Sequence, residues 1–170
     1  MIIFESERLY ARQFETGDIE DIFLLNSDQE VMQYIRSPQN REESKQFLEE
    51  NISYYINSPQ YGRWSIHDRA SHAFIGSFML RPSHLVTDSI EMGYALLKSY
   101  WGFGYGTEIV RSGLIYSFVH LKLPVIVAIT HPENSASKKV LLKCDFEFMG
   151  NILESGRKVN LFQIKNPSHG

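Results

Sequence analysis

The chain has 170 residues and a formal net charge of −3, which argues against a general nucleic-acid binder, because such domains are usually basic. Hydrophobic residues make up 43% of it, enough to bury one sizeable core, so we expect a single domain over residues 1–170. The sequence has no apolar run of about eighteen residues, no signal-peptide core and only one cysteine, Cys144, which rules out an internal disulfide. We therefore expect a cytoplasmic protein with no nucleic-acid or membrane partner.

The first half of the chain combines strand and helix patterns. The spacing of its apolar residues predicts a strand over 8–14, helices from residue 19, over 31–35 and over 41–56, and strands over 62–67 and 73–80. His67 and His72 flank the polar turn of the last two strands, but no third metal ligand is near them in the sequence. We therefore interpret both as surface histidines and predict no metal site.

A strand, a glycine-rich loop and a helix occupy the centre of the chain. Residues 89–96 alternate, which places four apolar side chains on one face and Glu91 on the other. Glycines at 102, 104 and 106 then lead into an amphipathic helix over 105–119. Glycine leaves the backbone open to a ligand, and the free N–H groups of a first helical turn bind phosphate. The sequence indicates an anion site, with a ligand-free tight turn as the alternative.

Two other phosphate-binding motifs do not fit this stretch. A dinucleotide site requires G-x-G-x-x-G and an acid about twenty residues later. Here Thr107 stands at the third glycine position, and the apolar strand expected over 125–130 contains no acid. A P-loop requires Gly-Lys-Ser/Thr after the glycines, which this chain lacks.

The last third of the chain is expected to complete the sheet. Its residue pattern predicts a helix from Asn134 or Ser135 to Cys144, followed by strands over 146–149 and 159–164. Residues 166–170 are expected to fray.

Two motifs make the chain resemble the GNAT superfamily of N-acetyltransferases, most closely its branch of ribosomal-protein N-terminal acetyltransferases. Residues 91–97 and 100–108 are similar to the acetyl-CoA-binding motif, with Trp101 at the position usually held by Gln or Arg. Residues 134–146 resemble the family's Asn-x-x-Ser helix ending in Lys-x-Gly-Phe, with Asp145 in place of the glycine. The likeness extends to residues 7–9 (ERL), so it covers nearly the whole chain.

The resemblance implies a fold and an activity. The fold would be α/β (α+β), with a mixed, mostly antiparallel sheet of six to seven strands, four to five flanking helices and a V-shaped cleft for acetyl-CoA. The activity would be transfer of acetyl from acetyl-CoA to a primary amine of a protein N-terminus, a polyamine or another small amine, by direct attack on the thioester. The alternative is a non-catalytic acyl-CoA-binding or regulatory module. Either would be a monomer or a homodimer.

The resemblance also implies site residues. Glu91 is the candidate general base, with a structural ion pair as its alternative role, and Ser137 is the candidate relay of a proton to the thiolate. A backbone N–H near Leu97 would stabilise the oxyanion. Residues expected to bind the co-substrate are Leu96, Leu97, Trp101, Gly102, Phe103, Gly104, Tyr105, Gly106, Thr107 and Asn134.

Three further expectations concern side chains near this site. Many family members place the thiolate's acid where this chain has Leu141, which motivates the non-catalytic alternative. Cys144 is expected to be a buried helix residue rather than a nucleophile. The early helical region borders the acceptor site in the family, but packing is the favoured role for most of its aromatic residues, Tyr34, Tyr54, Tyr55, Tyr61 and Trp64.

Overall fold

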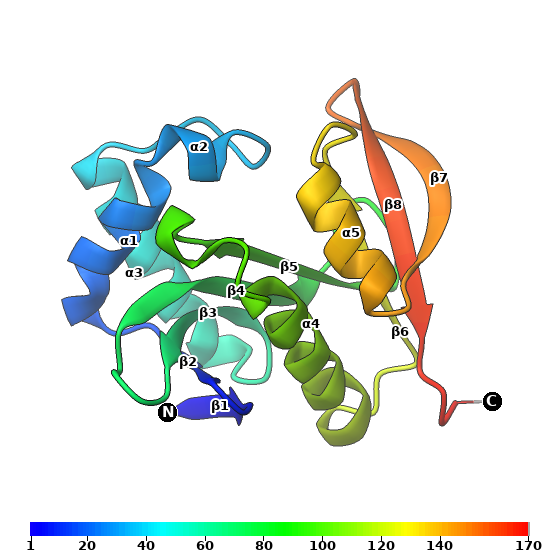
Figure 1. The fold of residues 1–170 in the computed structure, drawn as a ribbon, viewed down its shortest axis with the longest axis horizontal. Helices are drawn as coiled ribbons and strands as arrows, with labels where there is room; N and C mark the ends of the chain where they lie inside the picture. Colours follow the sequence, from blue (N-terminus) through cyan, green and yellow to red (C-terminus); the bar gives the residue numbers. More distant parts are fainter. Residues whose placement is uncertain (170) are drawn as a thin grey trace.

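The computed structural model describes residues 1–169, which form one eight-stranded sheet with helices on both faces (Figure 1). The strand order is β1-β2-β3-β4-β5-β6-β8-β7, and every neighbouring pair is antiparallel except β5 with β6. The strands are β1 Ile2–Glu5, β2 Leu9–Gln13, β3 Gly62–Asp68, β4 Phe74–Pro82, β5 Ile90–Leu96, β6 Val125–Thr130, β7 Glu147–Glu154 and β8 Arg157–Lys165. The mixed, mostly antiparallel fold is confirmed, with β1 as an additional edge strand.

Helices α1 and α3 cover one face of the sheet, and α4 and α5 cover the other (Figure 1). The helices are α1 Ile19–Asn26, α2 Gln29–Met32, α3 Arg41–Asn57, α4 Tyr105–Ile115 and α5 Ser135–Lys143. Short 3-10 turns occur at η1 Thr16–Asp18 and η2 Lys98–Tyr100, and a π-helical turn, η3 Tyr116–His120, follows α4. The helix predicted over 105–119 therefore keeps its α-helical form only to Ile115.

Close packing fixes α4 against the sheet. A Cβ added to Gly113 of α4 would lie 2.4 Å from the ring of Phe78 on β4, so only glycine allows this approach. Phe78 and Met92 lie in the larger apolar cluster, which includes Ile109 and Val110 of α4. The start of α4 is thereby held close to the end of β5, where the glycine loop joins them.

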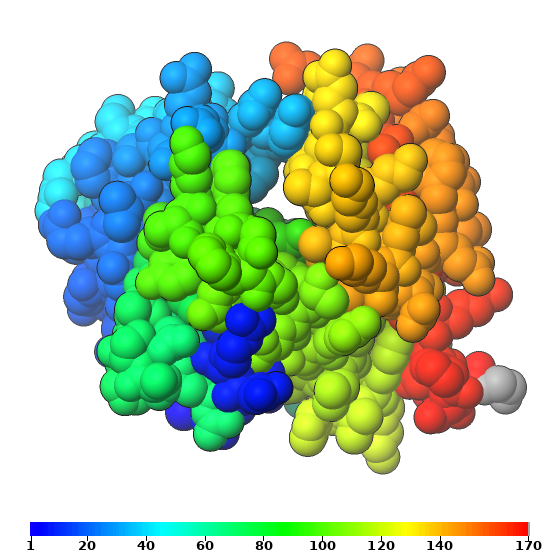
Figure 2. All heavy atoms as spheres, viewed as in Figure 1, coloured from blue at the N-terminus to red at the C-terminus, as the bar shows by residue number. Residues whose placement is uncertain are grey.

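Strands β5 and β6 separate soon after they meet. Their only paired residues are Ile90 with Ile126 and Glu91 with Val127, although β5 continues to Leu96. The space-filling view shows an opening between the end of β5 and the region of α5 (Figure 2). This opening is the V-shaped cleft that the resemblance implied, and Glu91 lies at its base.

His67 is not a surface histidine, contrary to the sequence prediction. It is 4% exposed, because β3 extends to Asp68 and turns this side chain inward. Its ring stacks on Tyr10 with centroids 5.2 Å apart, and its Nδ1 lies 3.2 Å from the carbonyl oxygen of His72. His72 is exposed, as predicted. Within residues 1–169, no group of three potential metal ligands occurs.

Several aromatic residues of the early region belong to the core, as predicted. Trp64 is fully buried, and Tyr55 is nearly so. The Tyr55 hydroxyl accepts a hydrogen bond from the Phe14 N–H at 3.1 Å and donates one to the Arg63 carbonyl oxygen. Cys144 is buried at the end of α5, which confirms its expected position.

Candidate active site

The glycine loop joins β5 to α4 with two residues in a left-handed conformation. Gly102 and Gly104 both have φ of +80°, which glycine adopts without strain. A Cβ at Gly102 would meet nothing within 4 Å, and one at Gly104 would meet only the guanidinium of Arg8, at 3.6 Å. Gly106 differs, because it lies in α4 and a Cβ there would be 3.2 Å from the Tyr94 hydroxyl. The first two glycines therefore shape the loop, and the third admits Tyr94.

Arg8 ties the loop to the start of the sheet. Its Nη1 donates to the carbonyl oxygen of Phe103 at 3.0 Å, and its Nε donates to Glu108 at 2.6 Å. Glu108 also accepts from the Arg8 backbone N–H and from the Ser6 hydroxyl. The hydrogen bond to Glu108 raises the pKa of Arg8 above its usual value. The sequence likeness included Arg8 but gave no indication of this role.

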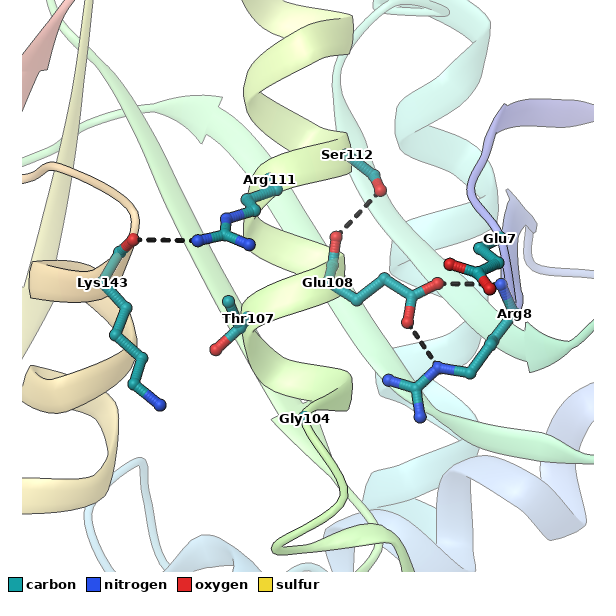
Figure 3. Close-up of a pocket in the computed structure, with 8 residues that line it drawn as sticks. All are labelled: Glu7, Arg8, Gly104, Thr107, Glu108, Arg111, Ser112 and Lys143. Carbon is teal, nitrogen blue, oxygen red and sulfur yellow. Dashed lines mark hydrogen bonds and ion pairs between the residues drawn. The ribbon is translucent and has the colours of Figure 1, made fainter.

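A cavity of about 620 Å³ opens beside the first turn of α4. Figure 3 shows that cationic side chains reach it from three separate segments: Arg8 before β2, Arg111 on α4 and Lys143 at the end of α5. Arg111 donates to the Lys143 carbonyl oxygen at 3.3 Å, a contact in which the Lys143 ammonium takes no part. Backbone amides at a helix start together with nearby cations provide the donors that phosphate groups require.

The backbone at the end of β5 narrows the prediction of an oxyanion donor near Leu97. The Leu97 N–H donates to the Ile75 carbonyl oxygen of β4 at 2.9 Å, so it cannot act as the oxyanion donor expected there. N–H groups alternate sides along a strand, so the N–H of Leu96 points toward the cleft instead. The Leu96 carbonyl oxygen is held by the indole N–H of Trp101 at 3.0 Å.

Glu91 lies at the base of the cleft on the face covered by α3. It is the last residue of β5 that pairs with β6, and its register partner on β4 is Arg81. Its Oε2 accepts a hydrogen bond from the Ser83 hydroxyl at 3.0 Å. Burial raises the pKa of the carboxyl above its usual value, although the Ser83 hydrogen bond opposes the shift. A carboxylate with a raised pKa is better suited to accept a proton near neutral pH.

A hydroxyl pair lies on the opposite face. The Tyr94 hydroxyl is directed toward α4, and burial raises its pKa to about 12, an effect that the nearby side chain of Ser137 on α5 opposes. Asn134 caps α5 by accepting from the Ser137 N–H at 3.1 Å. Leu141 is 3% exposed within the core, so its position does not reach the cleft. Sequence reasoning placed Tyr94 only on an apolar strand face and missed this contact.

The model of the acetyltransferase (GNAT) domain matches residues 8–147 of the chain. The chain belongs to the GNAT acetyltransferase family. Among its relatives, an uncharacterized N-acetyltransferase of Bacillus subtilis, YoaA, is 28% identical over 150 residues, which cover 87% of this chain and 84% of that protein.

Two solved structures share the fold of this acetyltransferase. An acetyltransferase (GNAT family) from Bacillus anthracis has a TM-score of 0.84 at 24% identity and covers 98% of this chain and 99% of its own. The ribosomal L7/L12 alpha-N-protein acetyltransferase RimL, in complex with coenzyme A, has a TM-score of 0.81 at 18% identity and covers 97% of this chain and 98% of its own.

Family membership identifies the reaction in general terms. This acetyltransferase is an acyltransferase that uses acetyl-CoA as co-substrate and an amine as acceptor. None of the helices in residues 1–169 has the length and hydropathy that a membrane span requires.

Proposed function

We propose that the acetyltransferase binds the pyrophosphate of acetyl-CoA on the backbone N–H groups of residues 102–107. The observation that carries the proposal is the separation of β5 from β6 beside an open, left-handed glycine loop. Arg8 pairs with Glu108, so Arg111 and Lys143 are the cations of the cavity in Figure 3 that can balance the other phosphate charge. The residues assigned to acetyl-CoA are Leu96, Leu97, Trp101, Gly102, Phe103, Gly104, Tyr105, Gly106, Thr107 and Asn134.

The pantetheine arm then lies along the edge of β5 that β6 leaves unpaired. An extended ligand can bind such an edge as an added strand does, through main-chain hydrogen bonds. The Leu96 N–H, which points into the cleft, is the donor that we assign to the thioester oxygen. Negative charge on that oxygen grows during attack, so a fixed donor there stabilises the transition state.

The amine attacks the thioester carbon from the face that bears Glu91. The new C–N bond forms as the amine proton passes to the Glu91 carboxylate, directly or through a water, and the C–S bond then breaks. Holding the amine in line with an activated thioester can supply effective molarities of order 10⁵ M, so no covalent enzyme intermediate is needed. The buried Cys144 supports a direct transfer.

The departing thiolate leaves toward the other face, where Ser137 and Tyr94 lie. We assign Ser137 to donate the proton to sulfur and the neighbouring Tyr94 hydroxyl to replace it. This pair takes the part that the tyrosine aligned with Leu141 plays in many family members. The base and the acid lie on opposite faces of the sheet, as a transfer through the cleft requires.

The proposal is tested by incubating the protein with acetyl-CoA and a mixture of peptides and small amines. We expect thiol release together with a product whose mass increases by one acetyl group, identified by mass spectrometry. Tight binding of acetyl-CoA with no thiol release for any amine would contradict a catalytic role for these residues.

A further inference from the structure

Three arginines lie on the face of the sheet that α3 covers and that bears Glu91; we call this face the acceptor side. Arg63 on β3 pairs in register with Met79, and Arg81 on β4 pairs with Glu91, so these side chains share the face that α3 covers. Arg36, from the segment between α2 and α3, stacks over the ring of Phe47 of α3 at 4.7 Å. Arg63 lies over the same ring at 5.5 Å. The cluster of Arg36, Arg63 and Arg81 therefore lies between α3 and the base of the cleft.

The arginine cluster has no acidic partner. Within residues 1–169, no carboxylate oxygen lies within 4.0 Å of any of the three guanidinium groups. The Nε of each is buried and makes no hydrogen bond. Other arginines of the chain behave differently: Arg8, Arg12 and Arg41 each pair with a carboxylate. What distinguishes this face is that three arginines without a carboxylate partner lie together there, each with a buried, unbonded Nε.

The contacts that hold the cluster orient it without balancing its charge. Arg81 lies over the ring of Tyr54 at 4.2 Å and donates to the Asn51 side-chain oxygen at 2.6 Å. Arg63 donates only to the sulfur of Met79, at 3.2 Å. Aromatic faces and neutral acceptors fix the planes of the guanidinium groups, but they leave three positive charges close together.

This arrangement is unfavourable in the absence of an anion. Partly buried charges are normally paired, because burial removes their hydration. Burial, and then the neighbouring charges of Arg36 and Arg81, lower the pKa of Arg63 to about 9. Glu91, the register partner of Arg81, makes its one side-chain hydrogen bond with Ser83. Negative charge supplied by a ligand would relieve the repulsion.

We propose that Arg36, Arg63 and Arg81 bind an anionic group, a carboxylate or a phosphate, on the acceptor itself. The acceptor is then a small amine that also carries negative charge, with its amine at Glu91 and its anion on the arginines. This inference rests on the proposed function, because Glu91 defines where the amine lies. Planar guanidinium forks match both carboxylate and phosphate oxygens. A polyamine would place positive charge against three cations.

The first experiment compares each of two anionic acceptors with a counterpart that lacks the negative charge. β-Alanine is compared with β-alaninamide, phosphoethanolamine with ethanolamine, and spermidine serves as the polycation. We expect kcat/KM to be at least about tenfold higher for the anionic member of the preferred pair, the scale of one charge-assisted hydrogen bond. The preferred pair distinguishes carboxylate from phosphate. Equal values within both pairs, or a preference for spermidine, would overturn the inference and leave the acetyltransferase function intact.

Arginine variants assign the preference to the cluster. Arg63→Met and Arg81→Met are expected to lower kcat/KM for the anionic acceptor about tenfold or more, mainly through KM. The kcat/KM for the neutral member of the same pair should change less than about twofold. Arg81→Lys keeps the positive charge but lacks the planar guanidinium fork, so its kcat/KM for the anionic acceptor should lie between those of wild type and Arg81→Met. Arg69→Met, an exposed arginine in the β3–β4 turn, is the matched control and should behave as wild type. Unchanged discrimination in the Arg63 and Arg81 variants would contradict the proposal.

A binding measurement separates this inference from the proposed function. Protein saturated with coenzyme A, so that its phosphate sites are filled, is titrated calorimetrically with succinate and with inorganic phosphate. We expect one of them to bind wild type and the Arg69 variant but not Arg63→Met. If this pattern appears while no amine is acetylated, the anion site stands and the proposed function fails. If amines are acetylated but neither anion binds, the anion site fails.

Discussion

Replacing Gly104 with alanine tests whether the backbone of the loop, rather than its side chains, binds acetyl-CoA. A Cβ at this position meets only the end of Arg8, at 3.6 Å, so crowding adds nothing. The φ of +80° remains, and this left-handed conformation is about 1–2 kcal/mol less favourable for an L-residue. Because residues 101–104 are exposed, we expect the free loop to relax to another conformation. Acetyl-CoA must then reimpose the strain, which weakens its binding about 5- to 30-fold.

Gly156→Ala is the matched control for this prediction. Gly156 has φ of +77°, a Cβ there would meet nothing within 4 Å, and it lies in the β7–β8 turn. It should carry the same strain and lower Tm by about 2–8 °C without changing acetyl-CoA affinity. Calorimetry with acetyl-CoA and thermal unfolding measure both quantities. Wild-type affinity and wild-type Tm together in the Gly104 variant, or an equal affinity loss in both variants, would refute the reasoning.

Four other substitutions test the catalytic groups and the packing. Glu91→Gln should lower kcat about 100-fold with acetyl-CoA KM little changed, and an unaltered rate would remove Glu91 from the mechanism. Burial raises the Glu91 pKa, so its native state binds the proton more tightly; the stabilisation is present below the ordinary pKa and lost as pH rises through the native one. Glu91→Gln should therefore raise Tm at pH 8 but not at pH 4. Tyr94→Phe and Ser137→Ala should each lower kcat about tenfold or more, and the double variant should lose no more than the larger single loss, whereas additive losses would separate the two hydroxyls. Gly113→Ala should lower the free energy of unfolding by about 1–3 kcal/mol, since its Cβ would lie 2.4 Å from Phe78, and an unchanged Tm would contradict that packing.

The centre of the fold could be predicted because its signals are local. Alternation over 89–96 predicts β5 and the face on which Glu91 lies, and the glycines at 102 and 104 indicate a loop with positive φ. Edge strand β1 could not be predicted in the same way. It has four residues, and an irregularity between Ile2 and Phe4 breaks the alternation that identifies a strand.

The acceptor side could not be predicted, because long-range register creates it. Arg36, Arg63 and Arg81 come from three separate segments and meet only when α3 packs over β3 and β4. The contact of Tyr94 with Ser137 likewise depends on how α5 lies beside α4. Single positions do carry a weak signal: Arg63 and Arg81 alternate out of phase with the buried Trp64 and Leu80 on their strands.

The most direct test of the account is a crystal structure of the protein with acetyl-CoA bound. We predict pyrophosphate oxygens within hydrogen-bonding distance of the N–H groups of residues 102–107, and the pantetheine arm in the opening between β5 and β6. Acetyl-CoA bound elsewhere, with that opening filled only by solvent, would contradict the central claim.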